Sequence, residues 1–183
     1  MPKTQTMKTS KAISLSYNKT QTRAEFFKRD FILLIIAAFI CMGNTVSATV
    51  YTASKMGDFN DDHVWSPEYP GNHITASDTV KIDGQITLNK DILIEGMVLV
   101  ASEASLVGSG NIVVTEDAFF INKGLSLVGG ITNQGIVYNK HILETNGDFI
   151  NTGKVLNNEN MIVGSIMENL GLVTGNGGQL TAS

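Results

Sequence analysis

Apolar and polar residues alternate in short runs from residue 79 to the C-terminus. Val, Ile, Leu, Phe and Thr fill the apolar positions, and Gly, Asn or Asp interrupts the pattern every few residues. A period of two is that of a strand with one buried face. Proline, which cannot donate to a strand ladder, is absent from this part of the chain. The pattern predicts an all-β fold. Examples are TVKID at 79–83, QITL at 85–88, NIVVT at 111–115 and AFFIN at 118–122.

The C-terminal third of the chain repeats itself with a fixed step. ITNQGIVYN at 131–139 returns as FINTGKVLN at 149–157 and as MENLGLVTG at 167–175. Similarity at a fixed period predicts a solenoid, in which each coil stacks on the preceding one. The alternative is that Asn-x-Gly marks ordinary hairpin turns of an antiparallel sheet. The repeated pairs, each 18 residues after the last, are Asn133–Gly135, Asn151–Gly153 and Asn169–Gly171.

A stacked coil gives each repeated residue a physical role. At a sharp corner, Gly135, Gly153 and Gly171 can adopt a positive φ without a Cβ penalty. Asn side chains about 4.8 Å apart can hydrogen-bond to one another along the axis as a ladder. The residues two positions after each glycine are then expected to form one inward stack, and they are Val137, Val155 and Val173. Asn122 and Gly124 resemble an earlier copy that is out of step.

Residues 49–78 differ from the repeats and predict a looped N-terminal cap. This segment is polar and irregular, and it contains the only tryptophan of the chain. The first coil of a solenoid exposes an unpaired edge, so terminal caps are needed. We expect Phe59 and Trp65 to cover the apolar end of the first coil, while Pro67 and Pro70 block further strand addition. Residues 79–183 then form the solenoid, and their last coil, without a similar cap, is expected to allow end-to-end self-association.

The N-terminus has the three parts of a secretory signal peptide in order. A basic stretch precedes the apolar run FILLIIAAFICM at 31–42, and small residues follow at 46–48. A membrane span needs about 20 apolar residues, so the run is short for one. We predict a signal peptide over residues 1–48 and a protein that is secreted or at the outer cell surface. An uncleaved anchor, with membrane contact through this segment alone, is the alternative.

The charge of residues 49–183 narrows the choice of partners. This part keeps six lysines and fifteen acidic residues, a net charge of −9. Such a chain repels phosphate backbones, which argues against a nucleic-acid partner. It also contains no cysteine, which excludes a disulfide framework and a thiolate metal site.

The sequence from residue 56 onward resembles secreted bacterial surface proteins. The resemblance rests on GDFNDDHVWSPEYPGNHITASDTVKIDGQITL at 57–88, with Gly-x-aromatic-Asn, Trp-Ser, a Pro-rich turn and Asp-x-Val-x-Ile-x-Gly. This pattern is also similar to the start of the G8 domain. The continuation resembles adhesin-like repeats, which implies a right-handed parallel β-helix. The pattern usually has Trp where Phe59 stands, and the sorting or anchoring domain that often ends such proteins has no counterpart here.

Few side chains in the sequence are spaced as the ligands of a metal ion or a cofactor would be. Asp58, Asp61 and Asp62 offer oxygen ligands that suit Ca²⁺, although their spacing is not that of an EF-hand and solvated loop acids are the alternative. His63, His73 and His141 lack the tight spacing of metal ligands. We predict no cofactor.

Parallel β-helices include polysaccharide lyases and hydrolases, so an enzyme of this fold has to be considered. Two carboxyls such as Asp148 and Glu168 could act as acid and base only if they share one face. We find no catalytic set, and we predict a structural or adhesive module that presents repeated polar faces to glycans or surface proteins. A fragment of a carbohydrate-active enzyme is the alternative.

Overall fold

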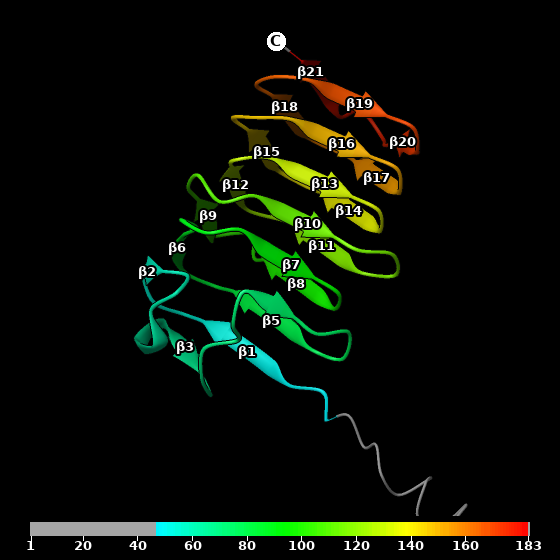
Figure 1. Cartoon of the computed structure of the whole chain (residues 1–183). Coiled ribbons are helices and arrows are strands. Elements are labelled where there is room, and N and C mark those ends of the chain that lie inside the picture. Colours follow the sequence, from blue (N-terminus) through cyan, green and yellow to red (C-terminus); the bar gives the residue numbers. More distant parts are fainter. Residues whose placement is uncertain (1–46, 183) are drawn as a thin grey trace, which may run out of the picture. The chain divides into compact units, whose positions relative to one another are not determined.

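The computed structural model describes residues 47–182, which form a parallel β-solenoid of about six turns (Figure 1). Each full turn adds one strand to each of three sheets, and each strand pairs in parallel with the strand one turn further on. The all-β solenoid predicted from the sequence is confirmed, and the hairpin alternative is wrong. Most of the predicted signal peptide lies outside the described residues. Within residues 47–182 no helix is long and apolar enough to cross a membrane.

The three sheets are named A, B and C. In spatial order, sheet A contains β3 (Trp65–Ser66), β1 (Val50–Ala53), β5 (Thr79–Ile82), β8 (Met97–Val100), β11 (Phe119–Asn122), β14 (Ile136–Asn139), β17 (Lys154–Asn157) and β20 (Leu172–Thr174). Sheet B contains β2 (Gly57–Asp58), β6 (Gln85–Thr87), β9 (Ser105–Val107), β12 (Leu125–Val128), β15 (Ile142–Thr145), β18 (Asn160–Val163) and β21 (Gln179–Ala182). Sheet C contains β4 (His73–Ile74), β7 (Ile92–Ile94), β10 (Ile112–Val114), β13 (Ile131–Asn133), β16 (Phe149–Asn151) and β19 (Met167–Asn169).

The core lies inside the coil and is built of columns of stacked side chains. In sheet A, Phe120 pairs with Val137, Val137 with Val155, and Val155 with Val173, so the predicted valine stack exists. The first three of these residues are fully buried. Because alternate residues of a strand point to opposite faces, the strict register keeps one apolar set inside on every turn.

Turn length varies along the solenoid. In sheets A and C the last turns repeat every 18 residues, but Asn160 and Gln179 in sheet B are 19 residues apart, and Phe119 lies 22 residues after its partner Met97. Asn122 therefore does not belong to the sheet C series that contains Asn133. It ends β11 and aligns with Asn139 and Asn157 at the corner between sheets A and B. The offset seen in the sequence reflects a different corner.

The predicted reason for the repeated glycines is wrong. Of these glycines, none has a positive φ, which among the described glycines occurs at Gly71, Gly108 and Gly177. The cause is instead the close approach of stacked backbones. A Cβ on Gly135 would lie 2.3 Å from the carbonyl oxygen of Thr115, and one on Gly171 would lie 2.1 Å from that of Gly153. No larger residue fits between the two turns without moving the backbone.

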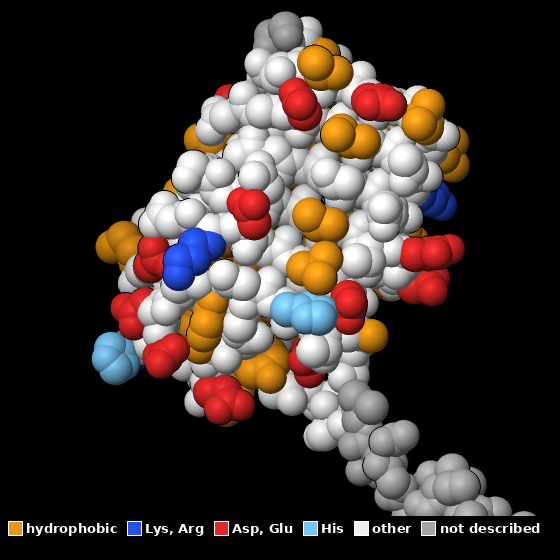
Figure 2. Space-filling model, viewed as in Figure 1, with side chains coloured by type: hydrophobic (Ala, Val, Ile, Leu, Met, Phe, Trp, Pro, Cys, Tyr) orange, Lys and Arg blue, Asp and Glu red, His pale blue; other side chains and the backbone are white. Residues whose placement is uncertain are grey.

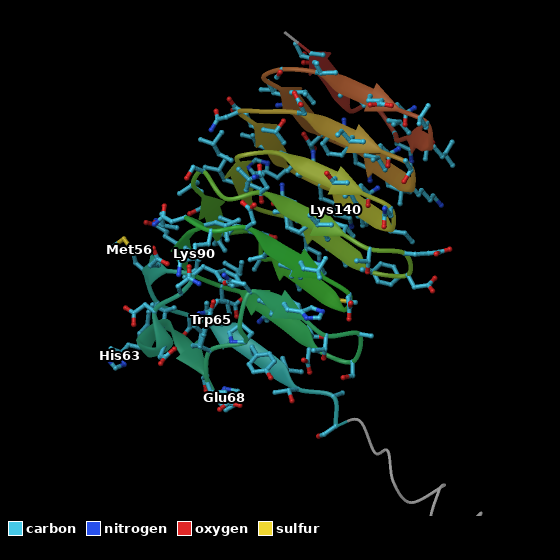
Figure 3. All side chains as sticks on the ribbon, in the orientation of Figure 1. Met56, His63, Trp65, Glu68, Lys90 and Lys140 are labelled. Atoms are coloured by element: carbon cyan, nitrogen blue, oxygen red, sulfur yellow. The ribbon has the colours of Figure 1, made fainter. Side chains whose placement is uncertain are left out.

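The N-terminal cap is a small aromatic cluster below the first full turn. Phe59 is fully buried and Trp65 is nearly so, with their rings edge to face at 4.9 Å. The indole N–H of Trp65 donates to the carbonyl oxygen of Phe59 at 2.7 Å. Trp65 and Ser66 form β3, which pairs antiparallel with β1 and occupies the outer edge of sheet A, and Pro67 follows directly. Figure 3 shows Trp65 against the ribbon of the first turn and His63 and Glu68 at the periphery.

Candidate interaction surface

The repeated asparagines form two hydrogen-bonded ladders inside the coil. In the sheet C ladder, Asn133 donates its amide to Asn151, and Asn151 donates to Asn169, each at 2.7 Å. The second ladder lies at the corner between sheets A and B, where Asn122 donates to Asn139 at 2.9 Å and Asn139 to Asn157 at 2.8 Å. The first two asparagines of each ladder are fully buried. Most of the recurring asparagines are therefore hidden from any partner, and only Asn169, on the last turn, is exposed.

The two ladders begin differently. The side-chain oxygen of Asn122 accepts a hydrogen bond from the hydroxyl of Ser126 at 2.9 Å, inside the coil. The side-chain oxygen of Asn133 is buried and has no hydrogen-bond partner. It follows Val114 in the register of sheet C, and valine has nothing to donate. An orphaned buried acceptor costs stability, about 1–3 kcal/mol.

Two of the three candidate calcium ligands, Asp58 and Asp61, accept hydrogen bonds from neighbouring groups of the protein. Asp58 accepts hydrogen bonds from the backbone N–H of Asn60 at 2.8 Å and from the side chain of Asn89 at 2.6 Å. Asp61 caps the short helix η1 (Asp62–Val64) by accepting from the N–H of His63 at 2.9 Å. In the part of the chain that the structure describes, no group of three or more acidic, His or Cys side chains could hold a metal.

The histidines lie apart. His73 contacts Glu95 at 3.1 Å on the outside of sheet C, whereas His63 belongs to η1 and His141 to the turn after β14. Near η1, burial raises the pKa of the Tyr69 hydroxyl, against a smaller lowering by its hydrogen bond from Asn60. The Tyr69 hydroxyl also donates to Asn72. This polar network supports the cap.

The two carboxylates considered for glycoside hydrolysis do not stack. Glu168 follows Ile150 in the register of sheet C, whereas Asp148 precedes β16 at a corner. Hydrogen bonds from Ser165 and from the backbone of Ile166 lower the pKa of Asp148. A general acid of a glycosidase needs a raised pKa, so this environment argues against that role.

The outer face of sheet A carries the most continuous apolar surface in the described part of the chain. On β8, β11 and β14 both outward positions are apolar, and the register stacks them in two columns. We call these six residues the sheet A strip. Its first column is Met97, Phe119 and Ile136, and its second column is Leu99, Ile121 and Tyr138. Leu156 and Leu172 continue it, interrupted by Lys154.

The other two faces are more mixed. Sheet B alternates apolar positions such as Leu125 and Ile162 with Gln85, Ser105 and Asn160. On sheet C, the outward column is mixed, and in register order it contains His73, Leu93, Val113, Thr132, Ile150 and Glu168. Figure 2 shows apolar side chains interspersed with polar and charged ones on the face in view. Monomeric proteins seldom expose continuous apolar patches without a use for them.

Charges of opposite sign border the sheet A strip. Glu116 and Asp117 are exposed in the turn that enters β11, and Lys123 is exposed directly after β11. Lys140, after β14, lies over the ring of Tyr138 at 4.9 Å from its centroid. At the level of β11 the strip therefore has an acidic border on one side and a basic border on the other.

The sequence alone did not predict the sheet A strip. Runs such as MVLV at 97–100 have apolar residues at consecutive positions, which do not reveal which side faces out. The signal that could have found it is the absence of alternation on one of the three sides of each turn.

Comparison with protein-family models, with curated proteins and with solved structures found no match. The fold therefore defines the class, a parallel β-solenoid of stacked short strands. The resemblance to adhesin-like proteins and to the G8 domain remains a prediction.

Proposed function

We propose that the protein is an exported structural or adhesive module of the cell surface, which acts through contact of a flat sheet face with a protein or a glycan. The observation that carries this proposal is the sheet A strip on a rigid stack of strands. Phe119 exposes 37% of its surface and Leu172 exposes 54%, although strands of the same sheet hold fully buried side chains on their other side. A flat apolar face held by cross-strand pairing meets a partner with little loss of conformational entropy.

Export is inferred from residues 1–48, which contain the three parts of a secretory signal peptide in order. The adhesin-like resemblance points to the same location. The proposal replaces the expected polar faces by an apolar one, because the repeated asparagines face the inside of the coil.

The test uses the full chain with a C-terminal epitope tag, expressed in its host. We expect the tag to be accessible to antibody on intact cells or to appear in the medium. Recovery of the chain only inside unbroken cells would overturn export. Retention on isolated cell-envelope material is then compared between the natural chain and Phe119→Lys, which we expect to bind at least about tenfold more weakly because a central apolar anchor is lost.

Leu125→Lys is the matched control for this comparison. Leu125 has the same exposure as Phe119, 37%, but lies on the outer face of sheet B. Equal binding of the two variants would contradict a role for the sheet A strip.

A further inference from the structure

We infer that the sheet A strip is a contact between two copies of this chain, which lie side by side with their coils running in the same direction. This inference rests on the proposed role of the strip as a contact surface, and it names the partner. Three features of the molecule bear on it: the register of sheet A, the charges along its borders and the area of the face.

A two-fold axis parallel to the coil axis superimposes the two columns of the strip. It places the first column of one copy over the second column of the other, at the same turn. Phe119 then faces Ile121 of the second copy, and Ile136 faces Tyr138 of the second copy, since each of these pairs occupies the two outward positions of one strand. Met97 and Leu99 meet in the same way. Apolar side chains meet apolar side chains on three successive strands.

The same axis exchanges the two borders of the face. Glu116 and Asp117 stand on the side where the chain enters β11, and Lys123 stands on the side where it leaves. In the parallel arrangement the acidic border of each copy therefore faces the basic border of the other at the level of β11. The antiparallel arrangement brings acidic border to acidic border, so charge complementarity selects the parallel one.

The area of the face sets the strength of the contact. Seven parallel strands about 4.8 Å apart, each with four residues of about 3.3 Å, form a face of roughly 400 Å². A stable dimer buries about 800 Å² on each partner. The contact is thus about half the usual size, and we expect a weak, transient dimer.

The measurement is the molar mass of the purified protein, as its host processes it, by sedimentation equilibrium. Concentrations run from about 5 μM to about 500 μM, a range in which weak dimers form. We expect mass to rise toward that of a dimer. Phe119→Lys should raise the dissociation constant at least about tenfold, whereas Leu125→Lys should leave it unchanged. A chain that stays monomeric throughout, or equal effects of the two variants, would overturn the inference.

Charge reversal tests the arrangement. Lys123→Glu places like charges together and should weaken the dimer about threefold, as expected for exposed charges. Adding Glu116→Lys and Asp117→Asn to it restores opposite borders and should restore the dissociation constant. Asn is used at position 117 because Asp117 has a φ of 66°, a backbone conformation that Asn tolerates. Failure of the triple variant to recover would rule out the parallel arrangement, since all three residues are exposed and none is part of the core.

Other occupants of the strip give different results. Phosphatidylglycerol vesicles that retain the natural chain but not Phe119→Lys, with no dimer in solution, would assign the strip to a lipid surface and refute the dimer. Loss of binding to cell-envelope material in Phe119→Lys, together with a monomeric natural chain, would sink the dimer but keep the proposed function.

Discussion

Asn133 and Asn151, 18 residues apart in the sequence, join two successive turns through a buried side-chain hydrogen bond of 2.7 Å. Asn151 in turn donates a side-chain hydrogen bond to Asn169 on the next turn. Each amide donates in the same direction along the coil, so every internal member needs both neighbours. The ladder is thus sensitive to a single replacement.

Asn151→Ala should lower the free energy of unfolding by about 1–2 kcal/mol, because the buried amide of Asn133 loses one of its two acceptors and Asn169 loses its donor. The loss is measured by urea unfolding followed by circular dichroism. Asn160→Ala is the control, since that residue is exposed on β18, and it should change the free energy by less than about 0.5 kcal/mol. Equal losses would show that the ladder adds nothing to stability.

Val114→Thr should be nearly neutral, because the new hydroxyl lies one turn from the orphaned oxygen of Asn133 and can donate to it. The same change at Val98, a fully buried residue between Val80 and Phe120, should cost about 1–3 kcal/mol. Thermal unfolding of both variants tests this. Two equal losses would mean that the oxygen is not available as an acceptor.

Gly135→Asn and Gly177→Asn distinguish backbone contact from backbone conformation. Gly177 has a φ of +82°, and a Cβ added there would have no atom within 4 Å, so Asn, which tolerates the left-handed region, should cost less than about 1 kcal/mol. Gly135 has no positive φ but a Cβ there would meet backbone oxygen at 2.3 Å, so the same change should cost about 2–3 kcal/mol or more. Urea midpoints in the reverse order would restore the conformational explanation.

Tyr69 should make stability depend on alkaline pH. Its pKa is raised in the folded protein, chiefly by burial, so the neutral hydroxyl is favoured by folding. This contribution is complete below the unfolded tyrosine pKa of about 10 and is lost as the pH rises through the folded value. The stability difference between the natural chain and Tyr69→Phe should therefore shrink between about pH 8 and about pH 11. A constant difference in urea unfolding at the two pH values would contradict it.

The fold was predictable because its cause is local and repeated. The 18-residue step fixes Asn133, Asn151 and Asn169 on successive turns, and hydrogen bonds between them follow from stacking alone. The role of Gly135 was not predictable, since it depends on the distance to Thr115 on the preceding turn. The same holds for Ser126, which closes the second ladder from the next strand.

The sheet A strip was harder to predict from the sequence than the fold. Phe119 and Phe120 are adjacent and equally apolar, yet only Phe120 is buried. Which of the two faces outward depends on the register of β11 against β8 and β14, and a shift of one residue would exchange them. Composition carries no information on that choice.

Because the last turns of sheets A and C repeat every 18 residues, insertion or deletion of one such unit would change the number of turns in the solenoid. Residues 136–153 and 154–171 carry Asn, Gly and an inward valine at matching positions, so an in-frame loss or duplication of one such unit keeps the asparagine ladders and the valine column in register. Each unit changes the length of the stack by about 4.8 Å. Unequal recombination between the repeats would thus change the length of the solenoid in equal steps of one turn, while the fold stays the same.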